Sequence, residues 1–303
     1  MAVHPSAAAP HHGPILVIGH RGMLGQDLLA RLASSGMAAI GLDLEEIDIT
    51  RSQQVHAITR DHHPSLVINC AAYTAVDQAE SEPDLAFAVN RDGPQNLADA
   101  CHGLGIPLIH ISTDYVFDGE ARRPYREDDA VNPINVYGHS KWEGEQAVRS
   151  RLLQHLIVRT AWLYGIHGHN FVKTILKLAR DREELRVVAD QYGSPTWTGD
   201  MSDALVAMAG QTLTDAGSMR WGTYHYCNAG ETTWYDLARL IVEQARRRGP
   251  VKVTRVVPIA SAEYPLPTPR PAYSVLDCTR IARSFGITPR PWPAALTDML
   301  KAL

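Results

Sequence analysis

Short continuous apolar runs alternate along this chain with longer stretches in which apolar residues recur at helical spacing. The apolar runs predict strands buried on both faces, at residues 15–19, 38–43, 66–72, 107–112 and 155–165. The stretches between them predict helices, at residues 23–36, 50–61, 83–103 and 135–151. This alternation is typical of a parallel sheet with right-handed crossovers and helices on both faces.

The second half of the chain follows a looser rhythm, with helices expected over 170–181, 200–210 and 233–248, and two more at the end. Short strands are expected over 185–188 and 253–257. We therefore predict an α/β protein. A Rossmann-type doubly wound sheet should cover 13–165, and a smaller, less regular substrate-binding lobe should cover 166–303, with some segments returning to the sheet. Residues 1–12 indicate a disordered extension, because they lack the apolar block of a signal peptide.

The composition of the chain limits the classes of molecule that it is expected to bind. The net charge of -4 leaves no basic excess for a nucleic acid, and no run approaches the roughly 20 apolar residues of a membrane span. The four cysteines lie far apart, which favours a reducing compartment and hence the cytoplasm. The histidine pairs lack carboxylate or cysteine neighbours at ligand spacing, so we name no metal ligand.

A glycine-rich loop, Gly19-His20-Arg21-Gly22-Met23-Leu24-Gly25, follows the first predicted strand and opens the first helix. Glycines at such a turn permit close approach of a pyrophosphate, which the positive end of the helix attracts. The alternative is a plain strand-to-helix turn, but the position in the first βα unit favours a dinucleotide coenzyme.

Two side chains near this loop favour different coenzymes. Asp43 ends the second strand, where a carboxylate can accept hydrogen bonds from the adenosine ribose, as NAD binding requires. Arg21 in the loop suits the 2′-phosphate of NADP. The sequence leaves the choice between NADH and NADPH open.

Tyr137 and Lys141 form the only Tyr-x-x-x-Lys of the chain and share one face of a predicted helix. A tyrosine is a poor acid or base at neutral pH unless its phenolate is stabilised, and a nearby ammonium would do this. We therefore expect Lys141 to lower the pKa of Tyr137. Thr113, at the carboxyl end of the fourth strand, is the expected hydrogen-bond partner of both the phenol and a substrate carbonyl.

Together, the glycine loop, Thr113, Tyr137 and Lys141 identify the chain as similar to the extended short-chain dehydrogenase/reductase superfamily. Further stretches resemble the dTDP-4-dehydrorhamnose reductase family; these are 71–77, 79–83, 135–138, 159–165, 190–196, Arg270-Pro271, Ser274 and Leu276-Asp277. This resemblance implies reduction of a nucleotide-linked ketosugar by NADPH or NADH, with Tyr137 as proton donor supported by Lys141.

The same resemblance implies the remaining contacts. Coenzyme-binding residues would be Gly19, Arg21, Gly22, Met23, Leu24, Gly25, Asp43, Asp48, Ile49, Ala71, Ala72, Thr74, Tyr137 and Lys141. Substrate-binding residues would be Thr74, Thr113, Asp114 and Trp162. Some relatives form homodimers, in some cases around Mg²⁺, although no local motif here names a ligand for that ion.

Four other functions compete with this one. A dehydratase of the same fold has Glu after its Thr-Asp pair, whereas Tyr115 follows Thr113-Asp114 here. A nucleotide-sugar epimerase, or another nucleotide-sugar reductase, remains open. A non-catalytic regulatory subunit of the methionine adenosyltransferase type also remains open, because such relatives keep the Tyr–Lys pair.

Overall fold

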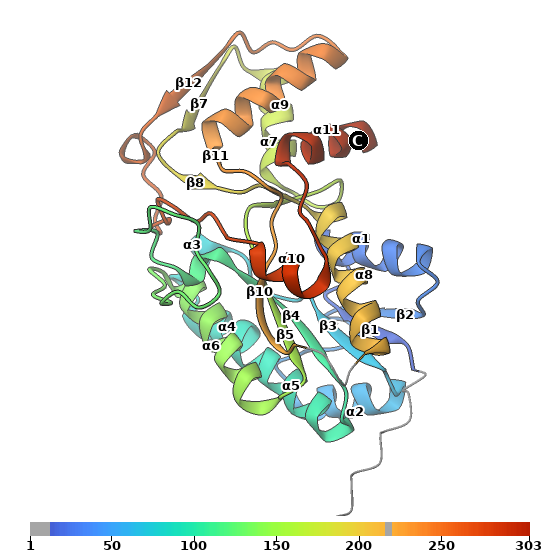
Figure 1. Ribbon diagram of the computed structural model, residues 1–303. Coiled ribbons are helices and arrows are strands. Elements are labelled where there is room, and N and C mark those ends of the chain that lie inside the picture. Colours follow the sequence, from blue (N-terminus) through green and yellow to red (C-terminus); the bar gives the residue numbers. More distant parts are fainter. Residues whose placement is uncertain (1–12, 216–219) are drawn as a thin grey trace, which may run out of the picture.

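The computed structural model describes residues 13–215 and 220–303, so the extension predicted over 1–12 lies outside the described residues. Its centre is a six-stranded parallel sheet with the order β10-β5-β4-β3-β1-β2 (Figure 1). The strands are β1 (Ile15–Ile18), β2 (Ala39–Leu42), β3 (Leu66–Asn69), β4 (Leu108–Thr113), β5 (His155–Thr160) and β10 (Gly222–His225). The predicted Rossmann-type α/β fold is confirmed.

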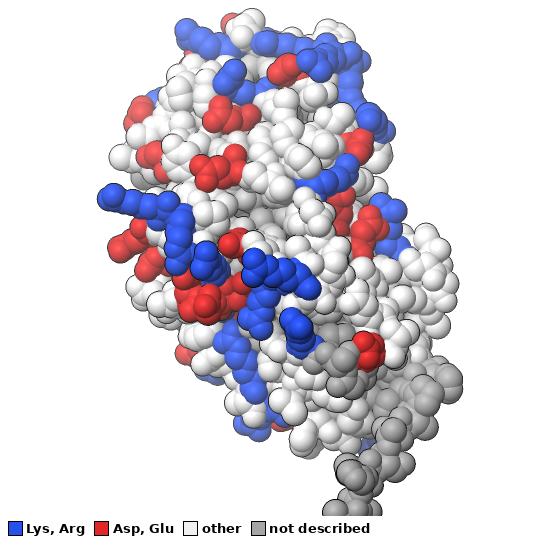
Figure 2. Space-filling view, viewed as in Figure 1, with Lys and Arg blue, Asp and Glu red and all other residues white. Residues whose placement is uncertain are grey.

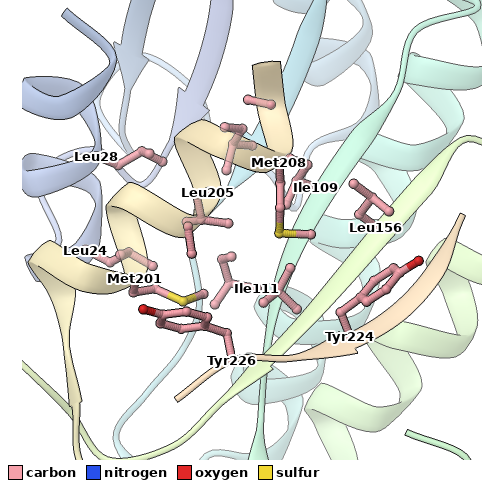
Figure 3. Packing of buried hydrophobic residues seen from close by; sticks show 14 of the residues in the cluster. Leu24, Leu28, Ile109, Ile111, Leu156, Met201, Leu205, Met208, Tyr224 and Tyr226 are labelled. Atoms are coloured by element: carbon pink, nitrogen blue, oxygen red, sulfur yellow. The ribbon is translucent and has the colours of Figure 1, made fainter. Parts of the chain in front are cut away.

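Helices cover both faces of this sheet because successive residues of each strand point to opposite sides. Ile15 and Val17 of β1 face α1 (Met23–Ser34), α8 (Thr198–Thr214) and α10 (Thr279–Phe285), as Figure 3 shows for much of this cluster. Leu16 and Ile18 face α2 (Ser52–His62), α5 (Gly93–Leu104) and α6 (Val136–Arg151). Every residue of β1, β3, β4 and β5 is buried, as expected for strands between two helical layers.

A second lobe lies beyond the carboxyl ends of the strands and has a core of its own (Figure 1). Its helices are α7 (Phe171–Asp181), α9 (Trp234–Arg248) and α11 (Trp292–Ala302). Short strands pair β7 (Glu184–Val188) with β12 (Arg255–Ile259), β8 (Tyr192–Gly193) with β11 (Thr232–Thr233), and β6 (Leu163–Tyr164) with β9 (Thr196–Trp197). The remaining short helices are α3 (Val76–Ala79), α4 (Pro83–Phe87), η2 (Asp114–Val116) and η3 (Ser261–Glu263).

The short strands β8 and β9 lie in 190–200, which was expected to be a loop, and β11, α3 and η3 were not predicted. Three further differences affect the central sheet and the helices around it. The strand β10 was not predicted, yet it pairs with β5 at the edge of the sheet. The run 155–165 was expected to form one strand, but Trp162 adopts φ +46° and separates β5 from β6. The helix expected over 83–103 contains a π-helical segment, η1 (Ala88–Asp92), which ends just before Pro94. Because proline has no backbone N–H, the regular pattern of helical hydrogen bonds is interrupted there.

The surface mixes charges of both signs. On the face seen in Figure 2, basic and acidic side chains are interspersed. Over the described residues, 13–215 and 220–303, every helix is too short or too polar to cross a membrane.

Candidate active site

The glycine loop brings backbone segments together where a side chain would not fit. Gly19 has φ +79°, and a Cβ there would lie 2.6 Å from the Ala71 nitrogen. A Cβ on Gly25 would lie 2.4 Å from the Gly19 carbonyl oxygen. Gly22 begins α1 without a side-chain cap, and the first turn carries no acidic residue. The first N–H groups of the helix are therefore available to an anion, so this cradle fits the pyrophosphate of a dinucleotide.

The residues expected around the adenosine lie in the glycine loop and in the segment that follows β2. The Arg21 backbone N–H donates to Asp43 Oδ2 at 2.9 Å, which joins the glycine loop to the end of β2. The backbone and hydroxyl of Thr50 donate to Asp48 Oδ1 at 3.0 and 2.7 Å, and these hydrogen bonds lower the pKa of Asp48. Ile49, in contrast, places its side chain in the core.

The two residues after Gly22 divide their roles. Leu24 packs into the core between α1 and the sheet. Met23 is half-buried, and the Asn170 amide approaches its sulfur at 3.5 Å. On the opposite side of the loop, Ala71 and Ala72 are half-buried and Thr74 is exposed. Of these three residues, Thr74 is therefore the one most accessible to a ligand.

Asn90 is a site residue that the sequence analysis missed. The π-helical segment η1 buries its side chain, whose Oδ1 accepts from the Tyr73 N–H at 2.9 Å. Its amide donates to the Tyr73 carbonyl at 3.0 Å and to Ser140 Oγ at 2.9 Å. Asn90 thus ties the segment after β3 to the helix that carries Tyr137. The pattern of apolar residues gives no signal for such a local change of helix type.

The proposed catalytic residues meet at the carboxyl end of β4. Thr113 is the last residue of β4, and α6 is capped at its start by Asn135, whose Oδ1 accepts the Gly138 N–H at 2.8 Å. A Cβ on Gly138 would lie 2.2 Å from the Tyr115 carbonyl oxygen, so the first turn of α6 lies directly against η2. This contact brings Tyr137 close enough to Thr113 for the threonine side chain to affect the pKa of the phenol.

Lys141 does not act on Tyr137 as the sequence led us to expect. Its Nζ donates to the Ile111 carbonyl at 2.7 Å, and burial lowers its pKa to about 8. Burial raises the pKa of Tyr137 to about 12, while the Thr113 hydrogen bond opposes that rise. The expectation that the ammonium lowers the pKa of Tyr137 is therefore wrong in this structure, because the desolvation of the phenolate outweighs every favourable contact.

Asp114 offers a free acceptor inside the site. Its side chain is 2% exposed, and Oδ1 accepts from Thr113 Oγ1 at 3.0 Å. The other oxygen, Oδ2, is buried without a hydrogen-bond partner among the described residues. Burial raises the pKa of Asp114 to about 6. A buried acceptor without a partner is costly, so this oxygen is suited to a ligand hydroxyl.

Trp162 forms the wall facing the second lobe. Its indole stacks on Trp234 with ring centroids 3.5 Å apart and an interplanar angle of 8°. A Cβ on Gly193 would lie 2.4 Å from the Trp162 ring, so this glycine also packs closely against the indole. This packing holds Trp162 in its left-handed backbone conformation, at the junction of the two lobes.

A buried ion-pair network joins α6 to the strands β4 and β5. Glu145 is 0% exposed and accepts from both Arg159 Nε and Nη2, at 2.8 and 2.7 Å. Arg149 and Ser112 donate to the same carboxylate at 2.8 and 2.6 Å. Because Ser112 precedes Thr113 on β4, this network fixes β4, β5 and α6 relative to one another.

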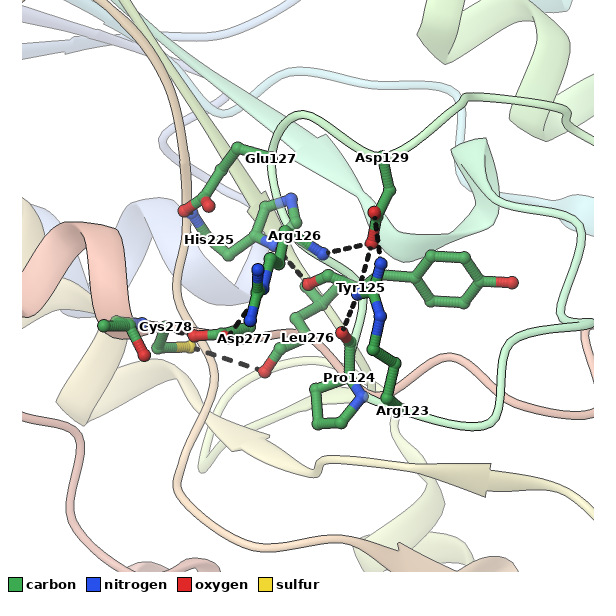
Figure 4. A network of polar contacts seen from close by, with 11 residues as sticks. Arg123, Pro124, Tyr125, Arg126, Glu127, Asp129, His225, Leu276, Asp277 and Cys278 are labelled. Atoms are coloured by element: carbon green, nitrogen blue, oxygen red, sulfur yellow. Dashed lines mark hydrogen bonds and ion pairs between the residues drawn. The ribbon is translucent and has the colours of Figure 1, made fainter.

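The chain returns to the site near its end. Figure 4 shows Tyr125 of the loop after η2 beside Leu276 and Asp277. The Tyr125 N–H donates to the Val275 carbonyl at 2.8 Å, and the Asp277 N–H donates to the Tyr125 carbonyl at 2.7 Å. Arg270, in the same returning segment, pairs with Asp77 at 3.0 Å. In the part of the chain described, no group of three or more His, Cys, Asp or Glu side chains is arranged to hold a metal ion.

Comparison with known proteins decides the family. Residues 13–303 match the family described as RmlD substrate binding domain. The chain belongs to the RmlD family. This confirms the resemblance inferred from the motifs in the sequence.

Individual RmlD relatives match over nearly their whole length. A dTDP-4-dehydrorhamnose reductase from Streptomyces griseus is 47% identical over 290 residues, which cover 95% of this chain and 93% of the relative. A dTDP-4-keto-6-deoxy-D-glucose reductase from Streptomyces niveus is 42% identical, covering 95% of this chain and 96% of the relative. The crystal structure of dTDP-4-dehydrorhamnose reductase from Bacillus anthracis in complex with NADP is 37% identical, with a TM-score of 0.88, and the match covers 96% of this chain and 99% of that one.

Proposed function

We propose that this chain reduces dTDP-4-dehydro-β-L-rhamnose to dTDP-L-rhamnose, with NADPH or NADH as the hydride donor. The observation that carries the proposal is the convergence of Thr113, Tyr137 and Lys141 at the carboxyl end of β4, beside a glycine cradle that fits a pyrophosphate. The RmlD relatives that bear this activity in their names support it.

The coenzyme would lie across the carboxyl ends of β1, β3 and β4, and its reduced nicotinamide would supply a hydride to the sugar carbonyl carbon. The glycine loop would bind its pyrophosphate through the start of α1. Asp43 would accept hydrogen bonds from the adenosine ribose, and Lys141 would hold the nicotinamide ribose. The remaining lining would come from Arg21, Met23, Leu24, Asp48, the backbone of Ile49, Ala71, Ala72 and Thr74.

Tyr137 would donate the proton that converts the developing alkoxide into a hydroxyl. With a pKa of about 12, the phenol is protonated throughout the neutral range, so the acid is loaded before each reduction. An alkoxide is more basic than a phenolate, and the proton therefore moves downhill despite that raised pKa. The Thr113 hydroxyl would hold the carbonyl oxygen as its charge grows, and such contacts accelerate the reaction because they strengthen in the transition state.

The sugar would lie between β4 and the second lobe. The unpartnered Asp114 Oδ2 would accept from a sugar hydroxyl, and Trp162 would contact the sugar with the part of its side chain that Trp234 leaves uncovered. Thr74 would approach from the segment after β3. We assign these three residues, with Thr113, to the substrate.

A second candidate is the reduction of a related dTDP-4-keto sugar. The relative from Streptomyces niveus, named for dTDP-4-keto-6-deoxy-D-glucose, is 42% identical, which lies within the 37–47% range of the curated dTDP-4-dehydrorhamnose reductases. The chemistry at the carbonyl would be the same, and only the sugar contacts would differ.

The test is coenzyme oxidation with substrate made in situ. Purified protein is mixed with dTDP-4-dehydrorhamnose or with dTDP-4-keto-6-deoxy-D-glucose, and the absorbance of NADPH and NADH is followed separately. We expect oxidation with the first sugar and a rate about 10²–10⁴-fold lower in Tyr137→Phe. Tyr264→Phe is the matched control, because that tyrosine is 57% exposed and lies outside the site.

Three results would contradict these assignments. Folded protein that oxidises neither coenzyme would reject the reductase and favour a regulatory subunit. A faster reaction with the second sugar would favour the second candidate. Equal rates for Tyr137→Phe and wild type would reject the tyrosine as proton donor.

We also propose that the protein acts in the cytoplasm, as a homodimer. All four cysteines are free thiols, which suits a reducing compartment. The homodimer rests on the family resemblance, and sedimentation velocity would measure it.

A further inference from the structure

Three carboxylates surround the single basic side chain of the glycine loop. This acidic rim consists of Asp43, Glu45 and Glu46, all in the segment that follows β2. The Arg21 guanidinium pairs with Glu45 at 2.7 Å through Nη1 and with Glu46 at 3.0 Å through Nη2. The Arg21 backbone N–H donates to Asp43 at 2.9 Å. The Arg21 guanidinium thus lies against two carboxylates at the surface, with 48% of its side chain exposed.

The acidic rim is held by its own turn. The Glu46 and Ile47 N–H groups both donate to the Asp43 carbonyl, at 2.9 and 2.7 Å. The Leu44 N–H donates to Asp43 Oδ1 at 2.9 Å, and Glu46 Oε2 accepts the Asp43 N–H at 3.0 Å. Because these bonds do not involve the Arg21 side chain, the carboxylates of Asp43 and Glu46 stay in place if Arg21 swings away, and Glu45, whose side chain is 73% exposed, stays in the same turn.

The rim lies where the two coenzymes differ. In a dinucleotide site of this fold, an acidic residue at the end of β2 accepts from the 2′-hydroxyl of the adenosine ribose, whereas a 2′-phosphate needs a nearby arginine. NADPH carries that phosphate and NADH carries the hydroxyl. Asp43 stands at this position, one residue beyond β2.

We propose that the acidic rim makes this enzyme prefer NADH over NADPH, with Glu45 and Glu46 as specificity-determining residues. A 2′-phosphate would meet three negative side chains and only one positive one. Asp48 adds no net charge nearby, because Arg51 pairs with it at 3.1 Å. Like-charge juxtaposition disfavours a ligand even where its other contacts are unchanged.

The positive charge of Arg21 does not outweigh the three carboxylates. Its ion pairs are exposed and therefore weak, so it is free to turn toward a phosphate. Doing so, however, would leave Glu45 and Glu46 uncompensated beside the new negative charge. The net charge of the rim, rather than the strength of any one pair, decides the preference.

The inference rests on the proposed function for its physiological meaning, but its test measures binding alone. Calorimetry with NADH and with NADPH gives the ratio of the two dissociation constants without any sugar substrate. For the wild type we expect NADH to bind at least about tenfold more tightly at low salt. In Glu45→Gln/Glu46→Gln the ratio should fall about tenfold, mainly through tighter NADPH binding. Added salt should narrow the wild-type ratio, because exposed charges are screened.

Glu243→Gln is the matched control, because Glu243 forms a similar exposed pair with Arg247 in the second lobe, and its ratio should equal that of the wild type. Equal or tighter binding of NADPH by the wild type would overturn the inference, as would an unchanged ratio in the double variant. Failure of both coenzymes to bind would refute the proposed function as well, so the two failures are distinguishable.

Discussion

The variant Arg159→Met removes the main partner of a fully buried carboxylate. Glu145 keeps the hydrogen bonds from Ser112 and Arg149 but loses the two from Arg159. Methionine fills similar apolar space, so the change isolates the charge. Breaking one side of a buried ion pair costs about 3–5 kcal/mol, and two hydrogen bonds to a charged group, at about 1.5–3 kcal/mol each, give a similar figure. We expect the free energy of unfolding at neutral pH to fall by about 3–5 kcal/mol.

The pH dependence gives this prediction a second signature. Burial raises the pKa of Glu145, but Arg159 and the other partners outweigh it and hold that pKa below its usual value. The stabilisation from the ion pair is therefore present at neutral pH and is lost as the pH falls through that depressed pKa. Without Arg159 the pKa of Glu145 should rise, so the carboxyl protonates earlier in the variant. The difference between variant and wild type should narrow as the solution is acidified.

Urea denaturation followed by tryptophan fluorescence measures both effects. Arg247→Met is the control, because Arg247 pairs with Glu243 at 2.6 Å but is 66% exposed, and it should change the unfolding free energy by less than about 0.5 kcal/mol. A loss below about 1 kcal/mol for Arg159→Met, or a loss that does not depend on pH, would refute the reasoning.

Two further predictions concern the active site. The reduction rate should fall above about pH 8, as Lys141 loses its proton, and initial rates measured between pH 6 and 10 test this. Tyr137, with a pKa of about 12, sets no limit in that range, so a rate that stays constant to pH 10 would contradict the prediction. Gly25→Ala places a Cβ 2.4 Å from a backbone oxygen of the glycine loop, and calorimetry should show coenzyme affinity reduced at least about tenfold, whereas Gly103→Ala, with nothing within 4 Å, should bind normally.

The sequence predicted secondary structure best where buried apolar residues follow one another in a regular pattern. Strands β3 and β4 lie between two helical layers, so both faces are apolar and the run itself reveals the strand. The spacing of Tyr137 and Lys141 predicted a shared helical face, and both residues lie on α6, where Lys141 is buried and Tyr137 half-buried. What the spacing could not supply was the desolvation around them, which depends on atoms from β4 and η2.

Other features depend on contacts between distant segments. Strand β10 has only four residues, Gly222–His225, and exists because β5 offers it a parallel edge. The sequence around Arg159 predicts only a residue in a strand, and its ion pair with Glu145 of α6 depends on the folded structure. The left-handed conformation of Trp162 depends on packing against Trp234, which is supplied by the other lobe. Local sequence patterns carry no record of such partners.

The late return of β10, α8 and α10 to the sheet means that the coenzyme-binding half is not an autonomous module. Cutting the chain after residue 165 would strip Leu28, Ile109 and Leu156 of their covering helices. The cut would also leave the backbone of β5 as an open edge, which invites pairing between molecules. The coenzyme-binding half therefore cannot be transplanted without the later segments that complete its sheet and cover it.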